Sequence, residues 1–474
     1  MSYKYFVRLF FTFTIASLLS GNSAFAQVTD STDFDFSVED NPQSIASFDL
    51  AGCIKYAIRY SEALKKAQLT VRTAHATIGE NLAKGLPQLS ADGSFTDNFK
   101  VQTSFFPIQF FDPTDESGKV IPIKISPKYS GNTSINFSQL IFDASYFIGL
   151  KAARMYEDVQ RRQMVLTEID IAESVAKSFY AVLISRERLT LIEQNYRRLD
   201  TLLKETRALN ENGFAEQIEV MRTEVAFNNI QTEKKKALGA VVLTEQLLKF
   251  QMGMPLSDSL ILSGDLTQME LNEQVLLDTE PDFKSRIEYN LLEKNKELQY
   301  VNLKYNKSIY YPSLTGVVSY GFNSSNNQFS EMVKFGTNWF GYGYWGLRLN
   351  IPILDGFKRR HTLEKVRIEI EKIEQDQKIF ERQTNIQATQ YKTVLAESIY
   401  DMSIQKRNME LAKEVVRVSK IKYTNGVGSN KEVIDAETDY KTAETNYYAA
   451  LYQAIINKVD LDKALGRIMQ EYAK

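Results

Sequence analysis

The sequence predicts a mainly α-helical protein with a small amphipathic β part, arranged as two internal repeats. Stretches free of glycine and proline, such as 357–425, are long enough to form single helices of ~100 Å. Four other stretches, each of about ten residues, alternate between apolar and polar side chains with the period of a β-strand. The same order of elements occurs twice along the chain, which indicates a duplication.

Composition excludes several classes of protein. The chain has 474 residues, one cysteine, two histidines and a net charge of −2. A single cysteine supports neither a disulfide framework nor a cysteine-based zinc site, and the charge gives no footprint for nucleic acid. Because no nucleophile, metal or phosphate-binding motif is present, we expect neither an enzyme nor a bound metal or cofactor.

The N-terminus has the pattern of a secretory signal. Two basic residues precede a largely apolar run, and an A-x-A pattern occupies 24–26, so residues 1–26 are predicted to be a signal peptide. Residues 27–46 are polar and acidic and are expected to form a mobile lead-in. No later stretch reaches the ~20 apolar residues of a membrane-spanning helix, so the mature protein would enter a membrane only through β-strands.

The first predicted repeat covers 47–255. Helical spacing extends from 48 to 86, and Pro87 ends it. Strands are predicted at about 88–102 and 132–142, with a long loop rich in aromatic residues and proline between them.

A long helical hairpin completes this repeat and is predicted to turn at 212–214, where Asn212-Gly213 marks a reversal. An irregular connecting segment, 256–281, follows.

The second predicted repeat covers 282–474 and has the same plan. Strands are predicted at about 313–323 and 344–354, and the helical hairpin is predicted to turn at 424–428. Short motifs recur at corresponding places: Leu86-Pro87-Gln88-Leu89 with Tyr311-Pro312-Ser313-Leu314, Phe142-Asp143 with Leu354-Asp355, and Asn212-Gly213 with Asn425-Gly426.

The four strands have the length of transmembrane β-strands, which need ~9–11 residues. Four strands cannot close a barrel, and open strand edges are costly in lipid. A membrane barrel would therefore need strands from several chains. The alternative is a soluble sheet with one solvated face.

These motifs together resemble the TolC family of outer-membrane efflux proteins, and the resemblance covers nearly the whole mature chain. It is carried by the duplicated plan, by Leu354-Asp355-Gly356, and by Tyr423-Thr424-Asn425-Gly426 leading into Glu432-Val433-Ile434-Asp435-Ala436.

The resemblance implies a homotrimer in the outer membrane, in which each chain gives four strands to a 12-stranded transmembrane β-barrel. A long α-helical tunnel would continue the barrel through the periplasm, and segment 256–281 would lie at its equator. The implied function is an exit duct for tripartite efflux or type I secretion. The partners would be a periplasmic adaptor and an inner-membrane pump of the RND or ABC type, and nucleic acid would not be a partner.

A pore gate is predicted near the second turn. Glu432 and Asp435 are three residues apart and share a helix face, so a trimer would gather six carboxylates around one aperture. The resemblance assigns Tyr423 and Glu219 to bridging positions of this gate, and it assigns Gly213, Gly426 and Gly428 to the adaptor-facing tip turns. The alternative is an ordinary solvated acidic face.

One position departs from the family pattern. Gly428 stands where the resemblance implies an arginine that forms a salt bridge between helices, and either Lys431 or Arg222 is a candidate substitute.

Two other functions remain open at this point. A secreted coiled-coil structural or adhesive protein would explain the helices, but not the strands or their repetition. A stand-alone outer-membrane porin would explain the strands, but porins place their length in strands rather than in ~100 Å helices.

Overall fold

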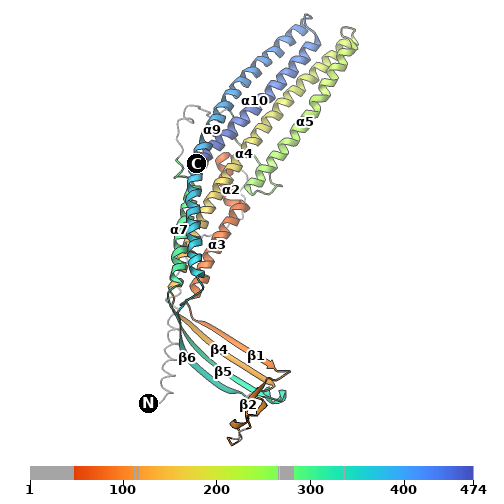
Figure 1. The fold of residues 1–474 in the computed structure, drawn as a ribbon. Helices are drawn as coiled ribbons and strands as arrows, with labels where there is room; N and C mark the ends of the chain where they lie inside the picture. Colours follow the sequence, from red (N-terminus) through yellow and green to blue (C-terminus); the bar gives the residue numbers. More distant parts are fainter. Residues whose placement is uncertain are drawn as a thin grey trace. The chain divides into compact units, whose positions relative to one another are not determined.

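The structure is a computed structural model that describes residues 47–111, 113–114, 117–264, 266, 282–334 and 337–472. The signal peptide and lead-in predicted at 1–46, and the whole second half of the connecting segment, lie outside the described residues. In the described part the chain is mostly helical and contains a four-stranded and a two-stranded sheet (Figure 1). None of the described helices is long and apolar enough to cross a membrane.

The four-stranded sheet is antiparallel throughout, with strand order β1-β4-β5-β6. Its strands are β1 (Gln88–Asp97), β4 (Tyr129–Phe142), β5 (Ser313–Asn326) and β6 (Phe340–Asn350). β1 and β6 are the edges, so in a single chain each has one row of unpaired backbone groups.

One face of this sheet is apolar. Leu89, Phe137, Val318 and Trp345 lie in one cross-strand row and therefore share a face. Leu89 and Trp345 are both 73% exposed, so the described helices leave this part of the face uncovered. An apolar sheet face left open in this way is suited to lipid.

The other face is polar and hydrogen-bonded. The Asn136 amide donates to Asp92 at 2.6 Å, and the Ser319 hydroxyl donates to the Asn136 side-chain oxygen at 2.7 Å. The Tyr342 hydroxyl donates to Asn132 at 3.0 Å, and a methyl group at Gly321 would lie 2.9 Å from the Tyr342 ring. Glycine at 321 therefore leaves room for the ring to lie across β5.

All four predicted strands had limits that differ from the structure: β4 starts at Tyr129 and not at 132, and β5 ends at Asn326 and not at 323. β1 ends at Asp97 and not at 102, and β6 covers Phe340–Asn350 and not 344–354. Pro352, predicted inside the last strand, lies beyond it, as expected for a residue without a backbone N–H.

The loop predicted between the first two strands contains a β-hairpin that sequence analysis missed. β2 (Thr103–Pro107) pairs antiparallel with β3 (Val120–Lys124), and a short 3-10 helix, η2 (Ile108–Phe110), follows β2.

Two very long helices link the sheet to the turns. Among the described residues, the helices longer than ten residues are α2 (Leu50–Tyr60), α3 (Glu62–Ala83), α4 (Ala144–Glu211), α5 (Gln217–Met252), α7 (Ile287–Ser308), α9 (Lys358–Thr424) and α10 (Asn430–Ala464). α4 has 68 residues and α9 has 67, which gives each a length of ~100 Å. α4 packs along α5 and α9 along α10, and both pairs end in turns remote from the strands (Figure 1).

Two aspartates explain where the long helices start. The Asp143 carboxylate accepts hydrogen bonds from the backbone N–H groups of Ser145 and Tyr146, which satisfies free donors in the first turn of α4. Asp355 accepts from the backbone N–H and the side chain of Arg359 at the start of α9. The repeated Phe142-Asp143 and Leu354-Asp355 motifs thus mark strand-to-helix junctions.

The first helix, predicted as continuous from 48 to 86, is divided at Ser61 into α2 and α3. Gly253 approaches the chain at this point. A methyl group at position 253 would lie 2.8 Å from both the Ser61 Cα and the Tyr60 carbonyl oxygen. The break therefore lies at a close tertiary contact that local sequence does not reveal.

The main apolar core lies around this contact and joins α2, α4, α5, α10 and α11 (Ile468–Tyr472). Cys53 is fully buried in it, and burial raises the pKa of its thiol to about 12. Cys53 is a packing residue within α2.

Gly253→Ala should destabilise the helical part, because Gly253 combines a left-handed backbone (φ +71°) with close backbone neighbours. We expect a loss of at least about 1–2 kcal/mol, seen as a lower midpoint of thermal helix loss by circular dichroism. Gly239→Ala is the matched control. Gly239 lies within α5 in open space, so alanine there should be neutral or stabilising by up to ~1 kcal/mol. Equal effects of the two substitutions would contradict this explanation.

Candidate functional site

The two helical hairpins end in turns of the same construction. Gly213 and Gly426 both have left-handed backbones, with φ of +79° and +75°. The next residue closes each turn: Phe214 N–H donates to the Leu209 carbonyl at 2.8 Å, and Val427 N–H donates to the Lys422 carbonyl at 3.0 Å. This is the bonding of a Schellman helix end, which favours glycine.

Gly428 is held against the preceding helix. Its N–H donates to the Lys422 carbonyl at 3.1 Å, and a methyl group in its place would lie 2.8 Å from the Lys422 Cβ. A larger residue at 428, such as the arginine implied by the family resemblance, would require this turn to open.

Glu219 and Glu432 occupy equivalent places at the helix starts. Each is the third residue of its helix, α5 and α10 respectively. The Ser429 hydroxyl accepts a hydrogen bond from the Glu432 backbone N–H at 3.2 Å and so caps α10. A carboxylate in the first turn also favours a helix through the helix dipole, so these residues have a structural role apart from any gate.

The salt bridge between helices for which Lys431 and Arg222 were candidates is not formed. Lys431 Nζ lies 3.1 Å from Asp435 Oδ2 on the same helix, and both side chains are exposed. In the described part of the chain Arg222 and Glu432 take part in no ion pair. Neither candidate substitute for the missing arginine therefore links the two hairpins in this structure.

Tyr423 lies where the two hairpins meet. It packs against the apolar cluster that contains Leu202 and Val433. Burial raises the pKa of its phenol, contact with Thr206 lowers it, and the nearby Glu219 and Glu205 carboxylates raise it further. The structure thus brings Tyr423 and Glu219 close together, while Glu432 and Asp435 remain exposed.

Sequence analysis missed the polar contacts that do link the hairpins. Asn430, the first residue of α10, is buried, and its amide donates to the buried Thr223 hydroxyl of α5 at 2.9 Å. The same amide lies 3.4 Å from the Glu219 carbonyl oxygen. A polar residue at the start of α10 was visible in the sequence, but its partner 207 positions away was not.

A buried ion pair forms a second link deeper in the bundle. Arg198 of α4 places Nε 3.1 Å from both carboxylate oxygens of Glu437 of α10. Glu437 is 5% exposed, and the guanidinium also lies over the Tyr440 ring, 5.4 Å from its centre. Lys441 and Glu233 form a further ion pair, between α10 and α5.

Two carboxylates at this second link, those of Glu437 and Glu444, have raised pKa values. Burial raises the pKa of Glu437, and Arg198 and Lys420 lower it in part. Burial also raises the pKa of Glu444, while Tyr440, Arg198 and Lys413 lower it and Glu437 raises it. The buried carboxylates of Glu437 and Glu444, on one side of α10, therefore share the single nearby guanidinium of Arg198.

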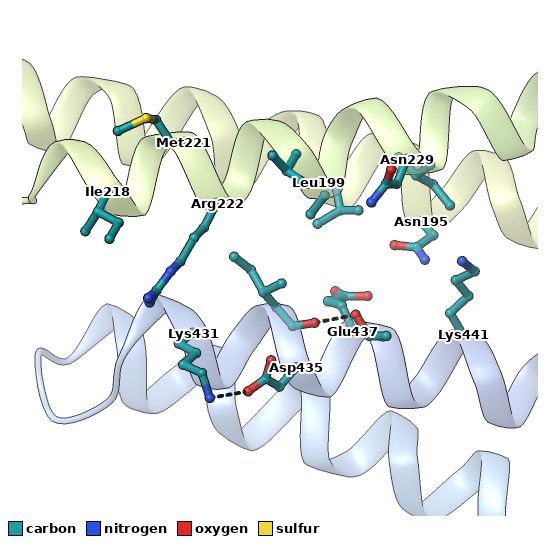
Figure 2. Close-up of a pocket in the computed structure, with 15 residues that line it drawn as sticks. Asn195, Leu199, Ile218, Met221, Arg222, Asn229, Lys431, Asp435, Glu437 and Lys441 are labelled. Carbon is teal, nitrogen blue, oxygen red and sulfur yellow. Dashed lines mark hydrogen bonds and ion pairs between the residues drawn. The ribbon is translucent and has the colours of Figure 1, made fainter.

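A groove of about 770 Å³ lies between the hairpins, and Glu437 and Lys441 of the second link are among the residues that line it. Figure 2 shows Ile218, Met221 and Arg222 of α5 on one side and Lys431 and Asp435 of α10 on the other. Ile218 and Met221 are about half exposed, so apolar side chains face an open groove next to the turns. Among the described residues, no cluster of three His, Cys, Asp or Glu side chains is placed to hold a metal ion.

Comparison with known proteins gives one family. Residues 54–254 and 299–467 match the model of the outer membrane efflux protein family. The chain is 20% identical over 362 residues to the outer membrane protein TolC of Vibrio cholerae serotype O1, covering 72% of this chain and 77% of that protein.

Solved structures with the same fold include outer-membrane channels. The Vibrio cholerae outer membrane protein VceC has a TM-score of 0.62 and 14% identity, covering 88% of this chain and 96% of that chain. The open state of the Neisseria gonorrhoeae channel MtrE has a TM-score of 0.65 and 16% identity, covering 90% of each. At these identities the likeness establishes the fold alone.

Arg198→Met should destabilise the tip region by roughly 3 kcal/mol, because it leaves the buried Glu437 without its partner. Arg198→Met with Glu437→Leu should recover most of that loss, since the uncompensated charge is then gone. Thermal unfolding of the wild type, both single variants and the double variant completes the cycle. Additive effects would mean that the two side chains do not interact.

Glu444→Gln should stabilise the protein at neutral pH, because burial raises the pKa of Glu444 and so disfavours its charged form. A raised carboxyl pKa contributes stability that is present at pH values below about 4.3 and is lost as the pH rises through the folded-state value. The stability advantage of the variant should therefore grow from pH 4 to pH 8. An advantage that is constant across this range would contradict the assignment.

Proposed function

Because this chain belongs to the outer membrane efflux protein family, we propose that it is the outer-membrane exit duct of a tripartite efflux or type I secretion system. As a family member it is an outer-membrane efflux channel of the TolC type, with its helical part in the periplasm. In the proposed role it conducts substrates passively and is not an enzyme. Energy and substrate choice come from an inner-membrane RND or ABC transporter, reached through a periplasmic adaptor.

The single observation that carries the proposed pore is the four-stranded sheet. Its apolar face is uncovered, its other face is polar and hydrogen-bonded, and both edges are open. In lipid, pairing β1 of one chain with β6 of the next would satisfy both edges. Three chains would close a 12-stranded barrel with the polar faces turned inward to water. This arrangement supports a homotrimer.

The proposed periplasmic end is the pair of helical turns, at the ends of α4 and α9. Gly213, Gly426 and Gly428 would shape tips that face the adaptor, and the half-exposed Ile218 and Met221 in the adjoining groove supply apolar surface for docking. Among the described residues, no hydrogen bond or ion pair joins the exposed Glu432 and Asp435 side chains to the other hairpin, which leaves them available to line an aperture. Tyr423 and Glu219 would act behind them, where the two hairpins meet.

Assembly tests the proposal directly. The purified protein should have the mass of three chains in detergent and fractionate with the outer membrane. Its gel mobility should also change on heating, because a folded barrel is more compact for its mass than the unfolded chain and therefore migrates faster for its mass. A monomer, or a soluble periplasmic product, would refute the proposed duct.

Glu432→Ala with Asp435→Ala should lower the cation-to-anion permeability ratio toward unity and weaken block by divalent cations in single-channel recordings. The reason is that a trimer would lose six carboxylates at its narrowest point. Asp376→Ala with Glu381→Ala is the matched control. It removes the same charge from exposed positions of α9 away from the turns. Unchanged selectivity in the tip variant would remove Glu432 and Asp435 from the gate.

A further inference from the structure

The polar face of the four-stranded sheet carries one charged side chain at each of its two edges. Asp92 lies in the edge strand β1, and Arg348 lies in the opposite edge strand β6 (Figure 1). Asp92 shares a cross-strand row with Tyr342, and Arg348 follows Tyr342 by an even number of positions, so all three side chains are on one face. In the described strands β1, β4, β5 and β6, no other charged side chain lies on this face.

Within one chain these two charges cannot meet. β4 and β5 lie between them, so the backbones of β1 and β6 are ~14 Å apart. The Asp92 carboxylate accepts a hydrogen bond from the neutral Asn136 amide, and in the described part of the chain neither Asp92 nor Arg348 forms an ion pair. A ring of identical chains joins two different surfaces of each chain, and opposite charges at the two edges make these surfaces complementary.

The internal duplication aligns the strands of the two repeats residue by residue. Pro87 and Pro312 directly precede β1 and β5, so these two strands correspond. Asp143 and Asp355 stand at the starts of α4 and α9, so β4 and β6, which precede them, also correspond. A strand residue in one repeat therefore has a defined counterpart in the other.

Both repeats pair their own strands in the same register. Gln88 of β1 lies opposite Ser138 of β4. Their counterparts, Ser313 of β5 and Asn350 of β6, also lie opposite each other. The alignment was made from motifs outside the strands, and the pairing inside the strands agrees with it.

The junction between the repeats then gives a register for the junction between chains. β4 of the first repeat pairs with β5 of the second, with Asn136 opposite Ser319. The counterparts of these two residues are Arg348 in β6 and Ser94 in β1. When β6 of one chain pairs with β1 of the next as β4 pairs with β5, Arg348 lies opposite Ser94 of the next chain.

This register keeps the two faces of the sheet continuous from chain to chain. It places Leu347 opposite Phe95 of the next chain, and both belong to the apolar face that carries Leu89. A shift by one residue would instead set apolar side chains opposite polar ones. On the polar face, Asp92 is two residues from Ser94 and so becomes the diagonal neighbour of Arg348, within reach of a long side chain.

We propose that Asp92 and Arg348 of neighbouring chains form an ion pair at each seam of the barrel, in the register that sets Arg348 opposite Ser94. The partner of each sheet edge is thus a second copy of this chain, and the pair lies on the side of the sheet turned to water. This inference rests on the proposed trimer, but it fails independently, because a trimer with another register would still be a closed barrel.

Charge reversal tests the ion pair. Arg348→Asp should lower the temperature at which the detergent-purified trimer dissociates by roughly 5 °C, because it places two carboxylates at each seam. Asp92→Arg should have a similar effect, since it places two guanidinium groups there. The variant with both substitutions restores opposite charges and should recover most of the loss. Losses that add in the double variant, or single variants with the wild-type temperature, would overturn the pair.

A disulfide tests the register without removing the charges. Thr96 and Gly346 are predicted to lie opposite each other across the seam, and a methyl group at Gly346 would have its nearest neighbour at 4.0 Å. Opposite residues of antiparallel strands are close enough for a disulfide. Thr96→Cys with Gly346→Cys, in a Cys53→Ala chain, should therefore give a covalent trimer on a non-reducing gel after oxidation and heating.

The matched control moves one cysteine along β6. Thr96→Cys with Asn350→Cys, in the same Cys53→Ala chain, places the second thiol ~13 Å farther along the strand and should give no covalent trimer. A trimer that does not cross-link through the first pair, or that cross-links through the control pair, would overturn the register. A wild-type monomer would instead refute the proposed duct itself.

Discussion

The open edges of the four-stranded sheet are the constraint on which the rest of this molecule depends. In the described part of the chain, no strand pairs with the outer sides of β1 and β6. Water would satisfy the backbone N–H and C=O groups there, but the uncovered apolar face places the same strands in lipid, where no water is available. The two properties are compatible only if the edges of different chains pair. Assembly of several chains is thus what the strand chemistry of the proposed duct requires.

The small number of strands also bears on the helical part. A chain that contributes only four strands must supply the rest of the duct with helices, and α4 and α9 run without a break for ~100 Å from the strand junctions. Helices of this length need reliable starts and turns. Asp143 and Asp355 provide the starts, and Gly213 and Gly426 provide turns with identical hydrogen bonding. The similarity of these pairs supports the predicted duplication.

The spacing of apolar side chains predicted the types of element well, because this spacing depends only on which side of a helix or strand is buried locally. Alternation of side chains located all four strands of the main sheet, and freedom from glycine and proline located α4 and α9. The misses are tertiary or compositional. The break at Ser61 depends on Gly253, and the β2–β3 hairpin was obscured because its prolines and aromatic residues resemble a loop. At the tips, Asn430 and Arg198 find partners more than 200 residues away, and no local pattern specifies which helix faces meet.

The tips combine firm and weak links between the hairpins in a definite order. Nearest the turns, the described residues that join them are neutral: the Asn430 amide bonds Thr223 and the Glu219 carbonyl, and Tyr423 and Val433 pack in an apolar cluster. Farther in, the buried Arg198–Glu437 pair joins α4 to α10 and would be costly to break. Separation of the hairpins at the turns therefore requires less free energy than separation at Arg198. If the tips of the proposed duct move, we therefore expect them to bend on the turn side of that ion pair, where Glu432 and Asp435 lie.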